Sequence, residues 1–266
     1  MDIAVVSRPN GRAWVCAPHI RYLGGTQAKK NTLKPWRIKS WCIPKVSTRF
    51  IAKMEDVLCV YERPYDPLRP VVCLDEKGKE LQAHLPAREP LPPRPGIQGG
   101  QGLEDYEYKR QGCANIFLAC EPLRGWRRTQ VTQERTALSF AAQLKQLVDQ
   151  DFPDAEKVVL VTDNLNIHGV WSLYEAFAAQ EAKRIADKLE WHYTPEHGSW
   201  LNMAELELSA LSRQCVNRRI PDIETLAAEC AAWEKERNDA CVTINWHFTA
   251  SDARIKLRRL YPIIMG

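Results

Sequence analysis

The run "KVVLVTD", residues 157–163, constrains the fold more than any other part of the sequence. Four consecutive apolar residues, three of them valine, lead through Thr162 into Asp163. Valine favours strands, and an unbroken apolar run is typical of a strand that is covered on both faces. The sequence therefore predicts a buried strand with a carboxylate at its end, which is where α/β proteins gather their ligands.

The segments around this strand alternate between strand and helix patterns. "RPVVCLDEKGKEL" predicts a strand that turns into a hairpin at its Lys-Gly pair, and two further strands are expected on either side of residues 122–125. Periodic apolar residues predict helices at 46–61, 135–151, 170–188, 203–216 and 222–239, with the strand "LEWHYTP" between the third and the fourth. The helix at 135–151 is expected to face the core through Leu138, Ala141, Leu144 and Val148.

This order predicts an α/β fold, with a mixed β-sheet flanked by helices. Ser47 or Thr48 can cap the first helix, and Thr249 or Ser251 can cap a last helix near the C-terminus. Residues 86–103 are rich in Pro and Gly and predict a long loop.

Composition excludes several classes of protein. The 266 residues are 45% hydrophobic, enough for one sizeable core with a small appendage, but no run of eighteen apolar residues exists. We therefore expect no membrane span, and the N-terminus does not predict a signal peptide. The nine cysteines are scattered singly without a C-x-x-C pair, so we expect neither a disulfide framework nor a zinc site, but buried thiols in a reducing cytoplasm.

Positive charge is concentrated at the N-terminus. Residues 1–50 contain ten Lys and Arg against one acid, Asp2, which gives +9 and leaves −5 for the remainder of a chain whose net charge is +4. A basic N-terminal arm, residues 1–45, is therefore expected beside a main domain, residues 46–266, and its scattered Pro and Gly residues predict irregular structure. Charge alone is equally consistent with an arm that binds a polyanion and with an arm that is merely solvated.

Three acids stand at the ends of predicted elements. Asp75 ends the first predicted strand of the sheet, Asp163 ends the fourth, and Glu205 opens the helix at 203–216. Carboxylates that converge on one point repel one another and are stable together only with cations. Oxygen ligands of this kind suit Mg²⁺ or Mn²⁺, and two such ions can assist phosphoryl transfer.

Asp75 and Glu205 also have a structural interpretation, whereas Asp163 at a strand end is less easily explained in that way. The sequence D-E-K-G around Asp75 is typical of a hairpin turn, and Asn202-x-x-Glu205 has the spacing of a capping box. Glu207 flanks the apolar stripe of its helix as Glu205 does, so periodicity does not choose between them. A single histidine after a strand, such as His168, is more often a hydrogen-bonded structural residue than a metal ligand or a base.

Three segments together, "VVCLDEK", "VVLVTDNLNIH" and "HYTPEHGSWLNMAELELSALSRQC", resemble bacterial insertion-sequence transposases related to mariner elements. The branch that they resemble most is the insertion sequence 630 family. The resemblance extends from about Lys29 to the C-terminus. It implies a ribonuclease H-like fold, DNA strand cleavage and strand transfer, and DNA as the partner, with a homodimer in the DNA complex.

The resemblance also implies roles for individual residues. Asp75, Asp163 and Glu205 correspond to the catalytic triad that holds two Mg²⁺ or Mn²⁺ ions, since Glu205 occupies the last position of L-N-x-x-E. Asn164, His168 and Asn202 would support the triad or contact DNA. Phosphate contacts are expected from Lys29, Lys30, Lys34, Arg37, Lys39, Arg124, Arg127 and Arg128, although the last three are equally consistent with a solvated turn.

The N-terminal arm departs from the family pattern. Only "KKNTLKPWRIKSWCIP" resembles the end of a helix-turn-helix region, so residues 1–45 are interpreted as the remnant of a DNA-binding region and linker. The chain would then be a truncated copy. Two alternatives follow: a catalytically inactive remnant with residual DNA binding, and a metal-dependent phosphohydrolase of small molecules.

Overall fold

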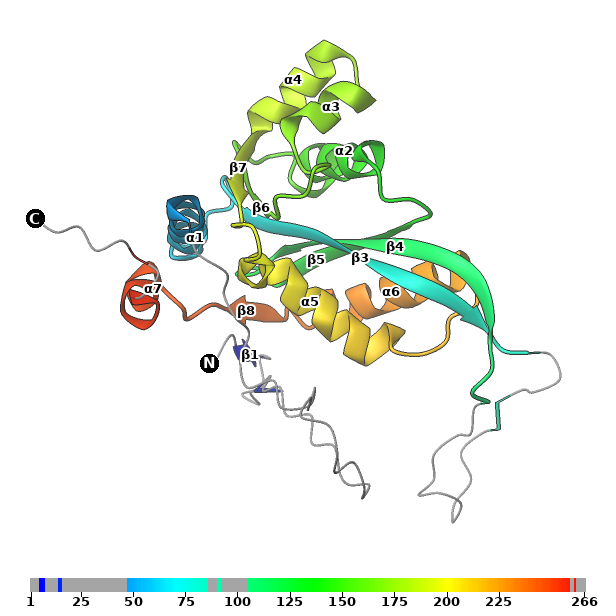
Figure 1. The fold of residues 1–266 in the computed structure, drawn as a ribbon. Coiled ribbons are helices and arrows are strands. Elements are labelled where there is room, and N and C mark those ends of the chain that lie inside the picture. Colours follow the sequence, from blue (N-terminus) through cyan, green and yellow to red (C-terminus); the bar gives the residue numbers. More distant parts are fainter. Residues whose placement is uncertain are drawn as a thin grey trace, which may run out of the picture.

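The structure, a computed structural model, describes residues 5–7, 14–15, 47–85, 90–91, 105–258 and 261. Its centre is a five-stranded sheet in the order β5-β4-β3-β6-β7 (Figure 1). β3 pairs antiparallel with β4, and β4 with β5, whereas β3, β6 and β7 run parallel. The predicted α/β class, a mixed β-sheet flanked by helices, is confirmed. The strands are β3 (Val71–Ala83), β4 (Lys109–Glu121), β5 (Trp126–Thr132), β6 (Val158–Thr162) and β7 (Leu189–Tyr193).

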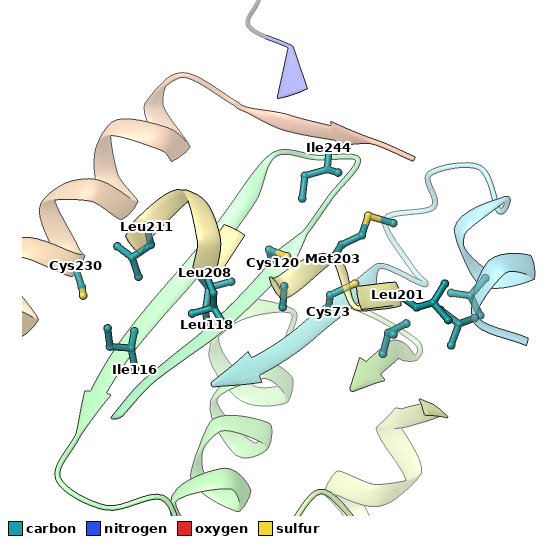
Figure 2. Close-up of a cluster of buried hydrophobic side chains, with 14 of the residues drawn as sticks. Cys73, Ile116, Leu118, Cys120, Leu201, Met203, Leu208, Leu211, Cys230 and Ile244 are labelled. Atoms are coloured by element: carbon teal, nitrogen blue, oxygen red, sulfur yellow. The ribbon is translucent and has the colours of Figure 1, made fainter. Parts of the chain in front are cut away.

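Helices cover both faces of this sheet because alternate residues of each strand point to opposite sides. Even-numbered residues of β3, such as Val72 and Leu74, pack in a core with α2 (Ala137–Gln146), α3 (Val170–Ala176) and α4 (Ala179–Lys188). Cys73 packs in a second core on the other face, part of which is shown in Figure 2. That core includes α1 (Thr48–Tyr61), α5 (Met203–Leu211), α6 (Ile223–Asp239) and α7 (Ala250–Lys256).

β6 is the buried strand that its apolar sequence predicts. All five of its residues are buried, and it lies between β3 and β7 in the sheet. Val159 and Val161 belong to one core and Val158 and Leu160 to the other. The strand therefore needs an apolar residue at every position, and its first polar side chains appear only at its end.

Three sequence predictions about the elements are wrong. No hairpin forms at the Lys-Gly pair, because β3 continues to Ala83 with β4 paired beside it, so Asp75 lies within a strand. The helix expected at 170–188 is two helices, since the backbone between α3 and α4 is extended at Phe177. Leu138, expected in the core, is 56% exposed at the start of α2.

The ends of the helices follow their predicted signals. The Ser47 hydroxyl accepts a hydrogen bond from the Phe50 amide at the start of α1. Thr249 caps α7 and forms a capping box with Asp252. α2 and α5 each continue into a short π-helical turn, at Leu147–Asp151 and Ser212–Val216.

The N-terminal arm contains two short strands rather than irregular structure throughout. β1 (Val5–Ser7) pairs with β2 (Trp14–Val15) and with β8 (Thr243–Asn245), which follows α6 (Figure 1). The rest of the arm, and most of the predicted loop at 86–103, lie outside the described residues. Within the described part of the chain, no helix is long and apolar enough to cross a membrane.

Candidate active site

The register of β3 and β6 places Asp75 and Asp163 side by side. Cys73 is the partner of Val161 in this parallel pair, so the same register carried two residues further aligns the two acids. Both acids follow the parity of Cys73 and Val161, which face the core beneath α5. Asp163 is the first residue after β6 ends, and its side chain is partly exposed.

Asn202 ties the start of α5 to Asp75. Its side-chain oxygen accepts a hydrogen bond from the Ala204 amide at 3.1 Å, which caps the helix. Its side-chain nitrogen donates to the Leu74 carbonyl at 3.0 Å and to Asp75 Oδ2 at 3.4 Å. Asn202 is fully buried, so it fixes the first turn of α5, and with it Glu205, against β3.

Asp75, Asp163 and Glu205 line one cavity of about 520 Å³. Glu205 is not part of a capping box, because the Asn202 amide donates to the Ser199 carbonyl at 2.7 Å instead. Glu76, Leu165 and Leu208 also line the cavity, and its other lining residues are basic or bear a hydroxyl group. They are Lys77, Arg135, Ser199, Ser209, Ser212 and Arg213.

Glu207 lies away from this cavity. It is 1% exposed, and two arginines neutralise it inside the protein. Arg237 donates to it at 2.8 and 3.1 Å, and Arg127 Nε lies 3.2 Å from Glu207 Oε2. The structure thus distinguishes the two glutamates of α5, which the helical wheel does not.

The pKa values of the two aspartates shift in opposite directions. Burial raises the pKa of Asp75 to about 7, and the charges of Glu76, Asp163 and Glu205 add to this increase. Burial also acts to raise the pKa of Asp163, but the hydrogen bond and charge of His168 outweigh it, so this pKa is lowered. Burial thus governs the pKa of Asp75, whereas the contact with His168 governs that of Asp163.

His168 is fully buried beneath the Phe140 ring, with the ring centroids 4.4 Å apart. Its Nδ1 bonds Asp163 Oδ1, and its Nε2 lies 2.9 Å from Glu76 Oε2. Burial lowers the pKa of His168, but these two carboxylates outweigh it and raise the pKa to about 9. With a carboxylate at each ring nitrogen, His168 has no free nitrogen for a metal ion.

Glu76 was not predicted from the sequence as part of this site. Its carboxylate is 2% exposed and also lies 3.2 Å from Arg135 Nη1. The signal was present in the pair Asp75-Glu76, because consecutive residues of a strand point to opposite faces. The prediction of a hairpin turn obscured it.

Of the other predicted supporting residues, Asn164 is held by α1, since its side-chain oxygen accepts a hydrogen bond from Lys53 Nζ at 3.0 Å.

The structure corrects the phosphate contacts expected of Arg127 and Arg128. Arg127 is 1% exposed and paired with Glu207. Arg128 is 8% exposed, and its Nε lies 2.7 Å from Asp151 Oδ2. Both guanidinium groups are neutralised inside the protein and do not reach a ligand at the surface. Arg124 is half-exposed in the turn after β4, and Lys29, Lys30, Lys34, Arg37 and Lys39 lie outside the described residues.

The three acids have the right chemistry for a hard divalent cation. Oxygen donors that bear negative charge suit Mg²⁺ or Mn²⁺, and three such carboxylates line this cavity together. Among the described residues, however, no group of three or more His, Cys, Asp or Glu side chains could hold a metal ion as it stands. Binding would require the carboxylates to turn toward one another across the cavity.

Comparison with known proteins assigns the family. The model of a DDE superfamily endonuclease matches residues 70–227, which is more than half of the chain and includes all three acids. The chain belongs to the DDE superfamily of endonucleases. No curated protein sequence matches this family member significantly.

Solved structures of the Mos1 mariner transposase are similar to this DDE superfamily chain. The paired end complex with Mn is 12% identical, with a TM-score of 0.48, over 77% of this chain and 62% of that one. The paired end complex with Mg is 15% identical, with a TM-score of 0.46, over 82% and 62%. The chain thus matches less than two thirds of the length of these structures.

We predict that the two glutamates of α5 differ sharply in their effect on stability. Glu207→Ala should lower the free energy of unfolding by about 3–5 kcal/mol, because it leaves two buried arginines without their acid. Glu205→Ala should change it by no more than about 1 kcal/mol, since only a favourable charge in the first turn of the helix is lost. Urea denaturation monitored by circular dichroism measures both. Equal effects would contradict the assignment of Glu207 as the structural acid.

Asp75→Asn should change how stability depends on pH. The pKa of Asp75 is higher in the folded chain than its ordinary value of 3.8, so the folded state retains this proton and stability falls as the pH rises from about 4 to 7. The variant should be more stable than the wild type at pH 8 by up to about 4 kcal/mol, and the two should converge near pH 4.

Denaturation midpoints at both pH values, with the exposed Asp154→Asn as control, measure this difference. Glu121, whose pKa is also raised to about 7 by burial, contributes equally to all three proteins. If the stability of the wild type and of Asp75→Asn changed with pH in the same way, the folded chain would not raise the pKa of Asp75.

Proposed function

We propose that this chain is the catalytic domain of a DNA transposase, which cuts DNA and joins the freed 3′ end to target DNA by using Asp75, Asp163 and Glu205. One observation supports this most strongly. Two adjacent strands and a facing helix direct three acids into a single cavity within the region that matches the DDE endonuclease family. We propose further that the chain belongs to the insertion sequence 630 family, which its sequence resembles.

The proposed role of the three acids is to hold two Mg²⁺ or Mn²⁺ ions. When bound, such a pair of ions activates a water molecule and stabilises the leaving oxygen in phosphoryl transfer. Asp75 and Asp163 lie side by side and would bind through their carboxylates, while Glu205 would approach from α5. Asn202 keeps Asp75 and α5 in register, because one side chain bonds both.

DNA is the substrate that the surroundings of the cavity suit. Arg135, Arg213 and Lys77 stand in its wall beside the acids, where positive charge can hold phosphates of the bound strand. Arg124 remains a proposed phosphate contact outside the cavity. We also propose a homodimer in the DNA complex, because the resemblance in sequence implies one.

We predict that Asp163→Asn abolishes metal-dependent DNA cleavage. Changes around metal ligands cost about 10- to 100-fold, so loss of a ligand itself should lower the rate at least about 100-fold. The assay uses supercoiled plasmid carrying the terminal repeats that flank the gene, with Mg²⁺ or Mn²⁺, and follows nicked and linear products on a gel. Asp154→Asn, an exposed acid just before β6, should cleave at the wild-type rate.

The same assay distinguishes the alternatives. Cleavage by Asp163→Asn at the wild-type rate would contradict the triad. A folded wild type that is as inert as Asp163→Asn would favour the inactive remnant with residual DNA binding. Turnover of a chromogenic phosphate ester without DNA cleavage would favour the small-molecule phosphohydrolase.

A further inference from the structure

The second acid of the pair Asp75-Glu76 serves the site from the opposite face of the sheet. We propose that Glu76 is a positioning residue, which fixes the Asp163 carboxylate by anchoring His168. The inference rests on the proposed function, because it assumes that Asp163 binds a metal ion. The carboxylate of Glu76 would thus position a metal ligand, whereas that of the neighbouring Asp75 would itself bind the metal ion.

Strand geometry separates the two acids. Asp75 shares a face with Cys73 and lines the cavity beneath α5. Glu76 shares a face with Leu74, and although it also borders the cavity, its carboxylate meets His168, which packs on Phe140 of α2. β3 extends beyond the end of β6, so beside Glu76 there is space for the loop that follows β6. His168 fills that space.

The loop after β6 begins at Asp163 and folds back, so that His168 contacts Asp163. The Leu165 amide donates to Asp163 Oδ1 at 3.1 Å, and the His168 amide donates to the Leu165 carbonyl at 2.9 Å. His168 Nδ1 bonds the same Oδ1 of Asp163. Both contacts use Oδ1, which leaves Oδ2 as the oxygen available for a cation.

Glu76 prevents the imidazole from turning. Its Oε2 lies 2.9 Å from His168 Nε2, and Phe140 packs against the ring, so a rotated ring would lose a carboxylate and a packing contact. Arg135 lies 3.2 Å from the other oxygen, Oε1. Each oxygen of Glu76 thus has its own partner, and the carboxylate, which is 2% exposed, is held in one orientation.

The two ends of the imidazole explain why a second carboxylate is needed. Nδ1 contacts Asp163 and lies 3.3 Å from Thr162 Oγ1, whereas Glu76 is the carboxylate at Nε2. Without Glu76 the ring would be held at Nδ1 alone, and the orientation of Asp163 would be less firmly fixed. Groups that orient metal ligands in this way commonly contribute about 10- to 100-fold to metal affinity.

We predict that Glu76→Gln weakens Mn²⁺ binding about 10- to 100-fold in calorimetric titration of the full chain. The Mn²⁺ concentration that gives half-maximal DNA cleavage should rise by the same factor, while saturating Mn²⁺ should restore most of the rate. The matched control is Glu80→Gln, four residues further along β3 on the same face, where the carboxylate lies 3.6 Å from Arg110. It should bind Mn²⁺ as the wild type does.

A double-variant cycle tests whether Glu76 acts through His168. His168→Gln should weaken Mn²⁺ binding, and adding Glu76→Gln to it should weaken binding little further. Thermal melts identify variants that do not fold. If Glu76→Gln is one of them, Arg135→Gln, which changes a half-exposed residue, should produce a smaller decrease in Mn²⁺ affinity.

Two results would overturn the inference: a folded Glu76→Gln that binds Mn²⁺ like the wild type, or effects of Glu76→Gln and His168→Gln that add in full. Failure of the proposed function gives a different pattern. In that case the wild type and Asp163→Asn bind Mn²⁺ equally, or neither binds it, and the metal site is refuted together with its positioning residue.

Discussion

The parallel pairing of β3 with β6 is the interaction on which the rest of the site depends. It aligns Cys73 with Val161 and thereby brings two acids from distant parts of the sequence into adjacent positions on one face. A shift of one residue would turn Asp163 to the opposite face from Asp75. The polar residues at the ends of β6, Lys157 and Asp163, limit such a shift, because both faces of the strand between them are packed against helices.

The acids in and around the site have three different kinds of surroundings. Glu207 is neutralised by two arginines and joins α5 to β5 and α6 inside the core. Glu76 is paired with His168 and Arg135 on the other face of the sheet. Asp75, Asp163 and Glu205 line one cavity, with His168 beside Asp163 and with Lys77, Arg135 and Arg213 in the same wall. Three carboxylates are thus gathered in this cavity, where a divalent cation would bind.

The sequence predicted the elements that are determined by local pattern. The apolar run of β6, the cap of α1 at Ser47 and the turn between β4 and β5 were all visible in it. A mixed sheet flanked by helices followed from the succession of elements, but the order of the strands within the sheet was not predicted. The three acids that line the cavity came from the resemblance to a family, since periodicity alone left Glu205 and Glu207 equivalent.

What the sequence did not predict depends on contacts between distant segments. The Lys-Gly pair of β3 has the composition of a turn, but β4 pairs with the strand through this point and keeps it extended. Arg127 and Arg128 look like a basic surface patch until Glu207 and Asp151 are found beside them. The role of Glu76 is hidden for the same reason, because His168 lies more than ninety residues away in the sequence.

The most direct test of the central claim is the position of Mn²⁺ in crystals of the chain soaked with that ion, located by anomalous scattering. The account predicts a peak between the carboxylates of Asp75 and Asp163, with Glu205 turned toward it and His168 still bonded to Asp163. A Mn²⁺ peak elsewhere, with Asp75 and Asp163 unchanged and apart, would contradict the account.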